Sequence, residues 1–388
     1  MGDPAGRVRR SYDLDMASTI SNELVLNAVT VARDGADRAE ANRRLPSETV
    51  DALAAAGLLR LCLPVDLGGP GAGPLETIEL IERVAHADGA AGWCSMISST
   101  TSSMAVFLEP DIARSVFASA RATGGVFAPN GVGRVEGDDV VVSGRWQWGS
   151  GTQHCDWVVG GARCDDGIQR TCIFPASAIE FHDTWFTSGM RGSGSLDFSV
   201  EEVRVPLERT VAPGRQAPRL EDPIARFPNF TLLAIGVAAV GLGVARRALD
   251  ELVEIAGAKT PQFSSRTLAE SGFAQGELAR AEASWRAARA HLHDTVGEAW
   301  DEALAGRPID VDRRVGMRLA AMHAASEATS VTDRAFTVAG GSAVYDTSVL
   351  GRCLRDAHVV PQHIMVAPRL AETLGKHLMG VDLDASMI

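Results

Sequence analysis

The order of secondary-structure patterns along the chain is the feature that most constrains its fold. Between residues 15 and 120, apolar residues recur at helical spacing. Between residues 124 and 206, short β-branched runs alternate with glycine-rich turns, which is typical of strands. From residue 223 onward the pattern is helical again, in long segments rich in alanine and arginine. This order predicts an α+β protein in which a sheet is held between two helical layers.

We therefore expect three domains: an N-terminal α-helical domain (residues 1–120), a central β domain (121–215) and a C-terminal helical bundle (216–388). The lengths of the last helical segments suit a bundle of four antiparallel helices. The most apolar stretch, Phe230 to Val244, is about 15 residues long. That length is too short for a membrane span and is typical of a buried helix.

Charge and cysteine content disfavour several classes of partner. The chain carries 37 Lys and Arg against 49 Asp and Glu, a formal net charge of -12 at pH 7. Such a balance disfavours nucleic acid and anionic membranes as partners. Six cysteines are scattered without a Cys-x-x-Cys pair, and residues 1–13 lack the apolar run of a signal peptide, so we expect a cytoplasmic protein. No His, Cys and Asp cluster has metal-ligand spacing, so we expect no metal.

Several short motifs, taken in order, carry the functional signal. They read APNG at 128–131, SGRWQWGSG at 143–151, GMRGSGS at 189–195, AGGSAVY at 339–345 and RDAH at 355–358. Together they resemble the acyl-CoA dehydrogenase superfamily over nearly the whole chain. The resemblance implies an N-terminal helical domain, a central β domain, a C-terminal four-helix bundle and a bound flavin. A flavin suits these motifs because its flat ring is covered by aromatic side chains and its polar edge is bound by loop backbone groups.

The resemblance also implies which residues bind the cofactor. In this family the β-domain loop lies beside the flavin, and the Gly-Gly segment contacts cofactor bound to a neighbouring subunit. The implied cofactor-binding residues are Ala128, Asn130, Trp148, Gly149, Ser150, Gln275, Gly340, Gly341 and Arg355. Two alternatives stay open: Trp146 and Trp148 could share one strand face and pack as core, and Arg355 could form a structural ion pair with Asp356.

Two departures from the family pattern argue against a dehydrogenase. Many acyl-CoA dehydrogenases carry their catalytic glutamate shortly after the Arg-Asp-Ala segment. Here His363 stands in place of the preceding tyrosine and Ile364 in place of the glutamate, and isoleucine cannot accept a proton. Pro261 stands where FAD-holding members have an arginine, which weakens the diphosphate clamp and leaves FMN and FAD both open.

With both departures, the chain resembles the two-component (group D) flavin-dependent monooxygenases of this superfamily. That resemblance implies reduced flavin (FADH2 or FMNH2) from a separate flavin reductase, with O2 as co-substrate. It implies hydroxylation of an aromatic, heteroaromatic or amine small molecule through a C4a-hydroperoxyflavin. Ser150 would hydrogen-bond near flavin N5, and His363 would lie over the reacting centre, either as a base or as a stabiliser of the peroxide. Ser99, Ser103 and His154 are candidates for the substrate pocket.

The family further implies a homotetramer, with sites built between subunits. Two other functions stay open at this point. One is an atypical acyl-CoA dehydrogenase with a relocated catalytic carboxylate such as Glu254. The other is a non-catalytic protein that uses the flavin-binding fold as a scaffold.

Overall fold

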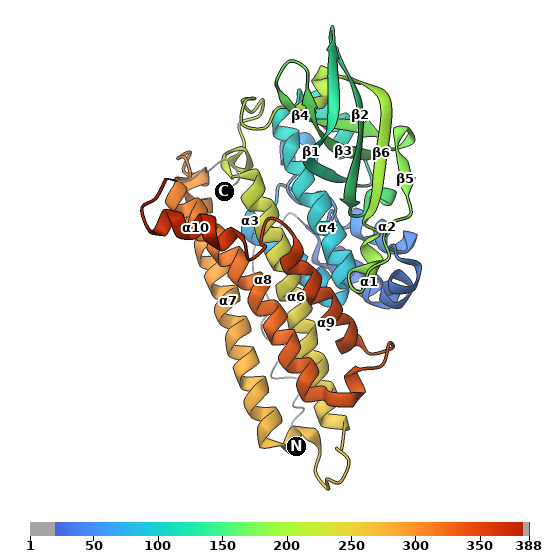
Figure 1. Ribbon diagram of the computed structural model, residues 1–388, viewed down its shortest axis with the longest axis vertical. Helices are drawn as coiled ribbons and strands as arrows, with labels where there is room; N and C mark the ends of the chain where they lie inside the picture. Colours follow the sequence, from blue (N-terminus) through green and yellow to red (C-terminus); the bar gives the residue numbers. More distant parts are fainter. Residues whose placement is uncertain (1–19, 383–387) are drawn as a thin grey trace.

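The structure, a computed structural model, describes residues 20–382 and residue 388, and confirms the predicted α+β architecture. Helices come first, then strands, then a second set of helices (Figure 1). The first helices are α1 (Asn22–Asn42), α2 (Ser47–Ala55), α3 (Pro74–Ala87), α4 (Gly89–Ser102) and α5 (Pro110–Ala113). The last are α6 (Asn229–Ala258), α7 (Gly272–Leu304), α8 (Val311–Ala339), α9 (Val349–Val359) and α10 (Leu370–Leu378).

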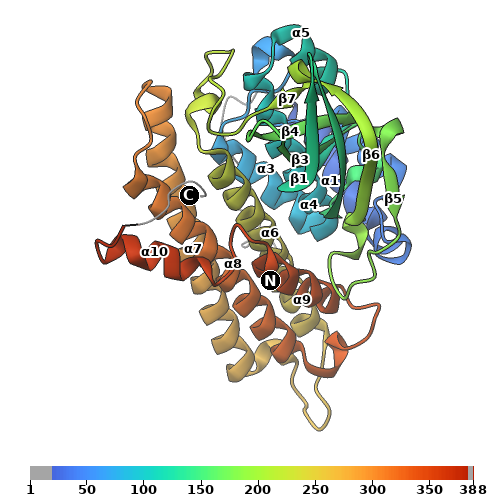
Figure 2. The same cartoon turned by 45° about the horizontal axis from the view of Figure 1, so that its top comes forward.

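A single seven-stranded sheet follows the first helices along the chain. It is not held between two helical layers as predicted, because α3 and α4 pack directly on α6 of the second set of helices (Figure 1). Its strand order is β5-β6-β2-β1-β3-β4-β7, and β1 pairs parallel with β3 while the other neighbours pair antiparallel. The strands are β1 (Thr123–Glu136), β2 (Asp139–Gly149), β3 (Trp157–Cys164), β4 (Gln169–Pro175), β5 (Glu180–His182), β6 (Leu196–Pro206) and β7 (Thr210–Val211). The bundle of α6, α7, α8 and α9 extends away from the sheet, and one end of it is remote from the strands (Figures 1 and 2).

Helix α4 is buried along its whole length because it is built mainly from small residues. The carboxylate of Asp88 caps its start by accepting from the Ala91 N–H over 3.0 Å. A Cβ at Gly92 would lie 2.5 Å from the Ala85 side chain, so only glycine lets α4 approach α3 this closely. On another side α4 packs against α6 and β1. Every side chain of α4 is therefore held between other elements of the chain.

Helix α6 is the core helix of the bundle. Among residues 20–382 and 388 it is the one helix long and apolar enough to cross a membrane, but 94% of its most apolar window is buried inside the protein. This agrees with the buried helix predicted from Phe230 to Val244.

The two tryptophans of β2 point in opposite directions, so the alternative that both pack as core is wrong. Trp146 is fully buried, whereas Trp148 is 67% exposed. The backbone of Trp148 has a φ of 65°, in the left-handed region, and the pairing of β2 with β6 shifts register between Trp146 and Gly149. This irregularity breaks the alternation of a regular strand. It leaves the indole of Trp148 outside the core, next to Gly149 and Ser150.

Trp146 fastens the centre of the sheet. Its indole N–H donates to the carbonyl oxygen of Gly161 over 2.9 Å and to that of Ala128 over 3.2 Å. Its ring stacks on Phe198 with centroids 5.2 Å apart. It therefore bonds to β1 and β3 while its ring packs on β6.

The two tryptophans provide a matched test of this packing. We expect Trp146→Ala to lower the free energy of unfolding by about 3–5 kcal/mol, because it opens a large cavity in the core. Trp146→Phe keeps an aromatic ring but leaves two carbonyl groups without the indole donor, and should cost about 1–3 kcal/mol. Trp148→Ala, the control, should change stability by less than about 0.5 kcal/mol. Urea denaturation measures all three, and an equal loss for Trp146→Ala and Trp148→Ala would contradict the assignment.

Candidate active site

Three segments far apart in the sequence meet through a row of hydrogen bonds. The indole N–H of Trp93, in α4, donates to Oγ of Ser150 over 2.9 Å. Oγ of Ser150 lies 2.7 Å from Oγ of Ser195, which lies 2.7 Å from Oγ of Ser193. The Ser193 hydroxyl donates to the carbonyl oxygen of Met190 over 2.7 Å. All five residues are buried, so this row is shielded from water.

His363 contacts the same tryptophan, Trp93. The two rings meet edge to face, with centroids 5.7 Å apart and planes at 70°. The backbone N–H of Met365 donates to Nδ1 of His363 over 3.3 Å. Burial, and after it the positive charge of Arg318, lower the pKa of His363 to about 4. The imidazole is therefore neutral at physiological pH, and because Nδ1 accepts, its proton is assigned to Nε2.

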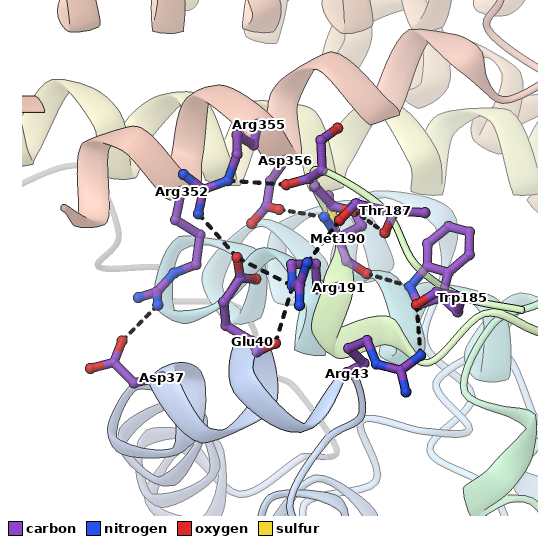
Figure 3. A network of polar contacts seen from close by, with 12 residues as sticks. Asp37, Glu40, Arg43, Trp185, Thr187, Met190, Arg191, Arg352, Arg355 and Asp356 are labelled. Carbon is purple, nitrogen blue, oxygen red and sulfur yellow. Dashed lines mark hydrogen bonds and ion pairs between the residues drawn. The ribbon is translucent and has the colours of Figure 1, made fainter. Parts of the chain in front are cut away.

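The loop from Thr187 to Ser195 is fastened between the C-terminal bundle and α1 (Figure 3). The buried carboxylate of Asp356, in α9, accepts from the Met190 N–H. Arg355, one residue earlier, donates from Nε to a loop carbonyl and from Nη2 to Glu40 of α1, both over 3.0 Å. The predicted cofactor residue Arg355 is thus engaged in holding this loop against α1 in the subunit.

The loop and α9 approach each other closely. A Cβ at Gly189 would lie 2.1 Å from the carbonyl oxygen of Arg355, so only glycine is accommodated there. Burial raises the pKa of Asp356 to about 7, although the hydrogen bond from the Met190 N–H and, less strongly, the charge of Arg352 lower it. This contact places the loop that carries Ser193 and Ser195 below Ser150.

Most hydroxyl groups of α4, and that of Ser103 just after it, bond to backbone oxygens, but the buried Oγ of Ser95 has no hydrogen-bond partner among the described residues. Ser99 and Ser103, both predicted for the substrate pocket, are buried and donate to Leu58 O and Thr100 O. The same kind of bond is made by Ser98, Thr100, Thr101 and Ser102. The protons of these hydroxyls are therefore committed to the protein, whereas that of Ser95 is not.

His154 and Ser150 line the same small cavity, together with Cys94 and Ser98. Its volume of about 10 Å³ leaves no room for an organic substrate. Burial, followed by the charges of Arg44 and Arg121, lowers the pKa of His154 to about 4, so the ring is neutral. In the structure His154 therefore lies beside a small cavity that Ser150 also lines.

The remaining residues of the β domain lie around a bulge in β1. The pairing of β1 with β3 shifts between Val126 and Gly131, and Ala128 and Asn130 are exposed within that interruption. Gly149 is buried at the end of β2, between the exposed Trp148 and the buried Ser150.

Gln275, Gly340 and Gly341 gather elsewhere, where α6 and α8 end and α7 begins. This is the end of the bundle remote from the sheet (Figure 1). Gly340 has a φ of 61° and ends α8, and Nζ of Lys259 caps that helix by donating to its last carbonyl over 2.6 Å. Gln275 is exposed and donates to Ala269 O over 2.8 Å. The structure does not bring this cluster together with Ser150 and His363 within one chain.

Sequence reasoning missed Trp93, Ser193 and Ser195 as site residues. Trp93 is the one aromatic residue in the run GAAGWCSMISSTTS, which was a usable signal. Ser193 and Ser195 stand in a Gly-Ser-Gly-Ser run that by itself does not indicate a partner. Within the described residues, no group of three or more His, Cys, Asp or Glu side chains could hold a metal ion.

Comparison with known proteins agrees with this geometry. The family model of the acyl-CoA dehydrogenase N-terminal domain matches residues 27–109, and that of the C-terminal domain matches residues 235–368. Indole-3-acetate monooxygenase of Pseudomonas putida is 33% identical over 374 residues, covering 94% of this chain and 95% of that protein. The chain belongs to the acyl-CoA dehydrogenase superfamily, in its branch of flavin-dependent monooxygenases.

Solved structures of the same branch have the same fold. The crystal structure of 3-HSA hydroxylase from Rhodococcus sp. RHA1 is 26% identical, with a TM-score of 0.88, and covers 97% of this chain and 100% of that one. XiaF from Streptomyces sp., in complex with FADH2 and glycerol, is 25% identical with a TM-score of 0.86, covering 93% and 95%. The resemblance drawn from the sequence motifs is thereby confirmed at the level of the family.

The low pKa of His363 predicts how stability responds to acid. The pKa of His363 is about 4 in the folded protein and has its ordinary value of 6.5 in the unfolded chain. As pH falls, the unfolded chain therefore takes up the proton first. The stabilising contribution is fully present above about pH 6.5 and is lost as pH falls toward 4. Between pH 7 and pH 4, the free energy of unfolding should therefore fall by roughly 1–3 kcal/mol more in the wild type than in His363→Gln. Equal losses in urea titrations of the two proteins would show that the folded state does not disfavour the imidazolium.

Proposed function

We propose that this protein is the oxygenase component of a two-component flavin-dependent monooxygenase. It takes reduced flavin, FADH2 or FMNH2, from a separate reductase and uses O2 to hydroxylate an aromatic or heteroaromatic small molecule. One observation carries the proposal: Ser150 and a neutral His363 flank Trp93, while Ile364 stands where a dehydrogenase would have its carboxylate. The family relationship to indole-3-acetate monooxygenase and to XiaF with FADH2 supports it.

The residues around Ser150 suit a reduced flavin. The exposed indole of Trp148 offers an apolar face to a flat ring, and the glycines at 149 and 151 leave the backbone accessible to a polar ring edge. Ser150 keeps one lone pair of its hydroxyl unused after accepting from Trp93, and can receive one more hydrogen bond. When bound, the flavin supplies the electrons and the activation of O2.

We propose that His363 acts as a hydrogen-bond donor and not as a general base. Its Nδ1 already accepts from Met365, and the low pKa keeps the ring neutral, so Nε2 presents a proton to the site. A donor at this point stabilises negative charge that develops on oxygen. It cannot take a proton from a substrate through the same nitrogen. The dehydrogenase alternative is disfavoured further because Glu254 is exposed on α6.

For the substrate we propose a planar apolar ring such as an indole. The hydroxyls of residues 98–103 donate to backbone oxygens, as Ser99 and Ser103 do, and Ser95 is the one hydroxyl of α4 without a partner in the part of the chain that the structure describes. Related proteins act on aromatic and heteroaromatic molecules, by the names they carry, and the relative from Pseudomonas putida acts on indole-3-acetate. An indole derivative is therefore the first candidate.

We also propose a cytoplasmic homotetramer. In one subunit the cluster of Gln275, Gly340 and Gly341 is remote from Ser150, so a flavin touching both must lie between two subunits. Large apolar side chains are exposed in the segments next to this cluster, as a subunit interface requires. They are Phe263, Phe273, Val344 and Tyr345.

Isotope labelling tests the proposed activity. The protein is mixed with a flavin reductase, NADH, flavin and ¹⁸O2, and indole-3-acetate, simple indoles and phenols are screened by mass spectrometry. We expect one ¹⁸O atom in the organic product, and no product without the reductase or without O2. His363→Ala should lower product yield by roughly ten- to a hundredfold while flavin is still consumed, because an oxygen-stabilising donor is lost. Oxidation of an acyl-CoA under anaerobic conditions would contradict the proposal.

A further inference from the structure

The row of serines beneath the candidate flavin site has a fixed direction. A serine hydroxyl has one proton and two lone pairs. Ser193 must give its proton to the carbonyl of Met190, because a carbonyl can only accept. In the 2.7 Å contact with Ser195, Ser193 is therefore the acceptor and Ser195 the donor. The direction of each remaining bond follows from this first one.

The same count of protons and lone pairs determines the direction of the hydrogen bond between Ser150 and Ser195. Ser195 has already given its proton to Ser193, so in its 2.7 Å contact with Ser150 it can only accept. Ser150 must then donate to Ser195, and it accepts from the indole N–H of Trp93. Its proton points into the protein, and what remains for a ligand is a lone pair.

We propose that Trp93, Ser195 and Ser193 are positioning residues that fix the proton direction of Ser150, so that Ser150 meets a ligand as an acceptor only. This inference rests on the proposed function. A reduced flavin carries a proton on N5 and can donate there, whereas N5 of an oxidised flavin has a lone pair. An acceptor facing N5 therefore pairs with the reduced form and repels the oxidised one.

This arrangement suits a protein that must take reduced flavin from solution and release it once oxidised. The preference for reduced over oxidised flavin comes from the buried row of serines and not from Ser150 alone. A serine hydroxyl outside such a row could turn and donate to N5 of the oxidised flavin. Both ends of the row are fastened: Met190 is held by Asp356, and Trp93 lies in the fully buried helix α4. Reversing the direction would leave Oγ of Ser193 and the Met190 carbonyl oxygen facing each other at 2.7 Å with no proton between them, although that carbonyl also accepts from Nε1 of Trp185.

The test compares two dissociation constants, measured separately for FMN and for FAD. The dissociation constant of oxidised flavin, measured in air, is divided by that of reduced flavin, measured under anaerobic conditions. The wild type should have a ratio well above one. Ser195→Ala removes the acceptor of the Ser150 proton, so Ser150 can turn toward the ligand and the ratio should fall roughly tenfold. Ser195→Thr keeps the hydroxyl and should restore the wild-type ratio, which a purely structural role of Ser195 would not require.

Two further variants keep the inference falsifiable. Ser193→Ala removes the acceptor of the Ser195 proton and should also lower the ratio. It replaces Ser195→Ala as the test variant if Ser195→Ala does not fold. Ser102→Ala is the matched control, because this buried serine bonds to Ser99 O outside the row, and its ratio should equal that of the wild type. An unchanged ratio in folded Ser195→Ala or Ser193→Ala that still binds flavin would overturn the inference and leave the proposed function intact. A wild type that binds neither redox form of flavin would overturn both.

Discussion

The hydrogen bond between the Met190 N–H and the buried carboxylate of Asp356 is the constraint on which the site depends. It joins the C-terminal bundle to a loop of the β domain across 166 residues of sequence. Arg355 strengthens the junction by bonding to the same loop and to Glu40 of α1. Because the Met190 carbonyl also accepts from Ser193, the position of α9 determines where the serine row lies. Helix α9, the loop of residues 187–195 and helix α1 are thus joined to one another by hydrogen bonds next to the serine row.

The site works through donors and acceptors that are already committed. Ser150 presents a lone pair because its proton is used, and His363 presents Nε2–H because Nδ1 is used. Trp93 lies between them and contacts both. Preorganisation of this kind needs little rearrangement at the moment of reaction, which is the usual source of electrostatic catalysis. A serine or a histidine can in general either donate or accept a hydrogen bond. Neighbouring residues therefore decide that Ser150 accepts and His363 donates.

Much of the architecture could be predicted, because helical and β periodicities are local signals, and the α+β fold class is confirmed. The loss of a carboxylate at Ile364 and the presence of His363 could also be found by comparing motifs. Trp93 could not be linked to Ser150 and Ser195, because they lie 57 and 102 positions later in the sequence and meet only through tertiary packing. Whether Trp148 faces a cofactor or the core was left open, because its outward turn depends on one residue with a positive φ. The hydroxyls of α4 were expected to face a substrate, since their bonds to backbone oxygens cannot be read from composition.

The central claim is that this protein binds reduced flavin and brings it to react with O2. Rapid mixing tests it most directly: the protein is loaded with reduced FMN or FAD under anaerobic conditions, mixed with oxygenated buffer and followed by flavin absorbance. The account predicts a transient species whose spectrum differs from those of reduced and oxidised flavin and that decays in a second, slower phase. A single phase that leads directly to oxidised flavin, at the rate of free flavin in the same buffer, would contradict it.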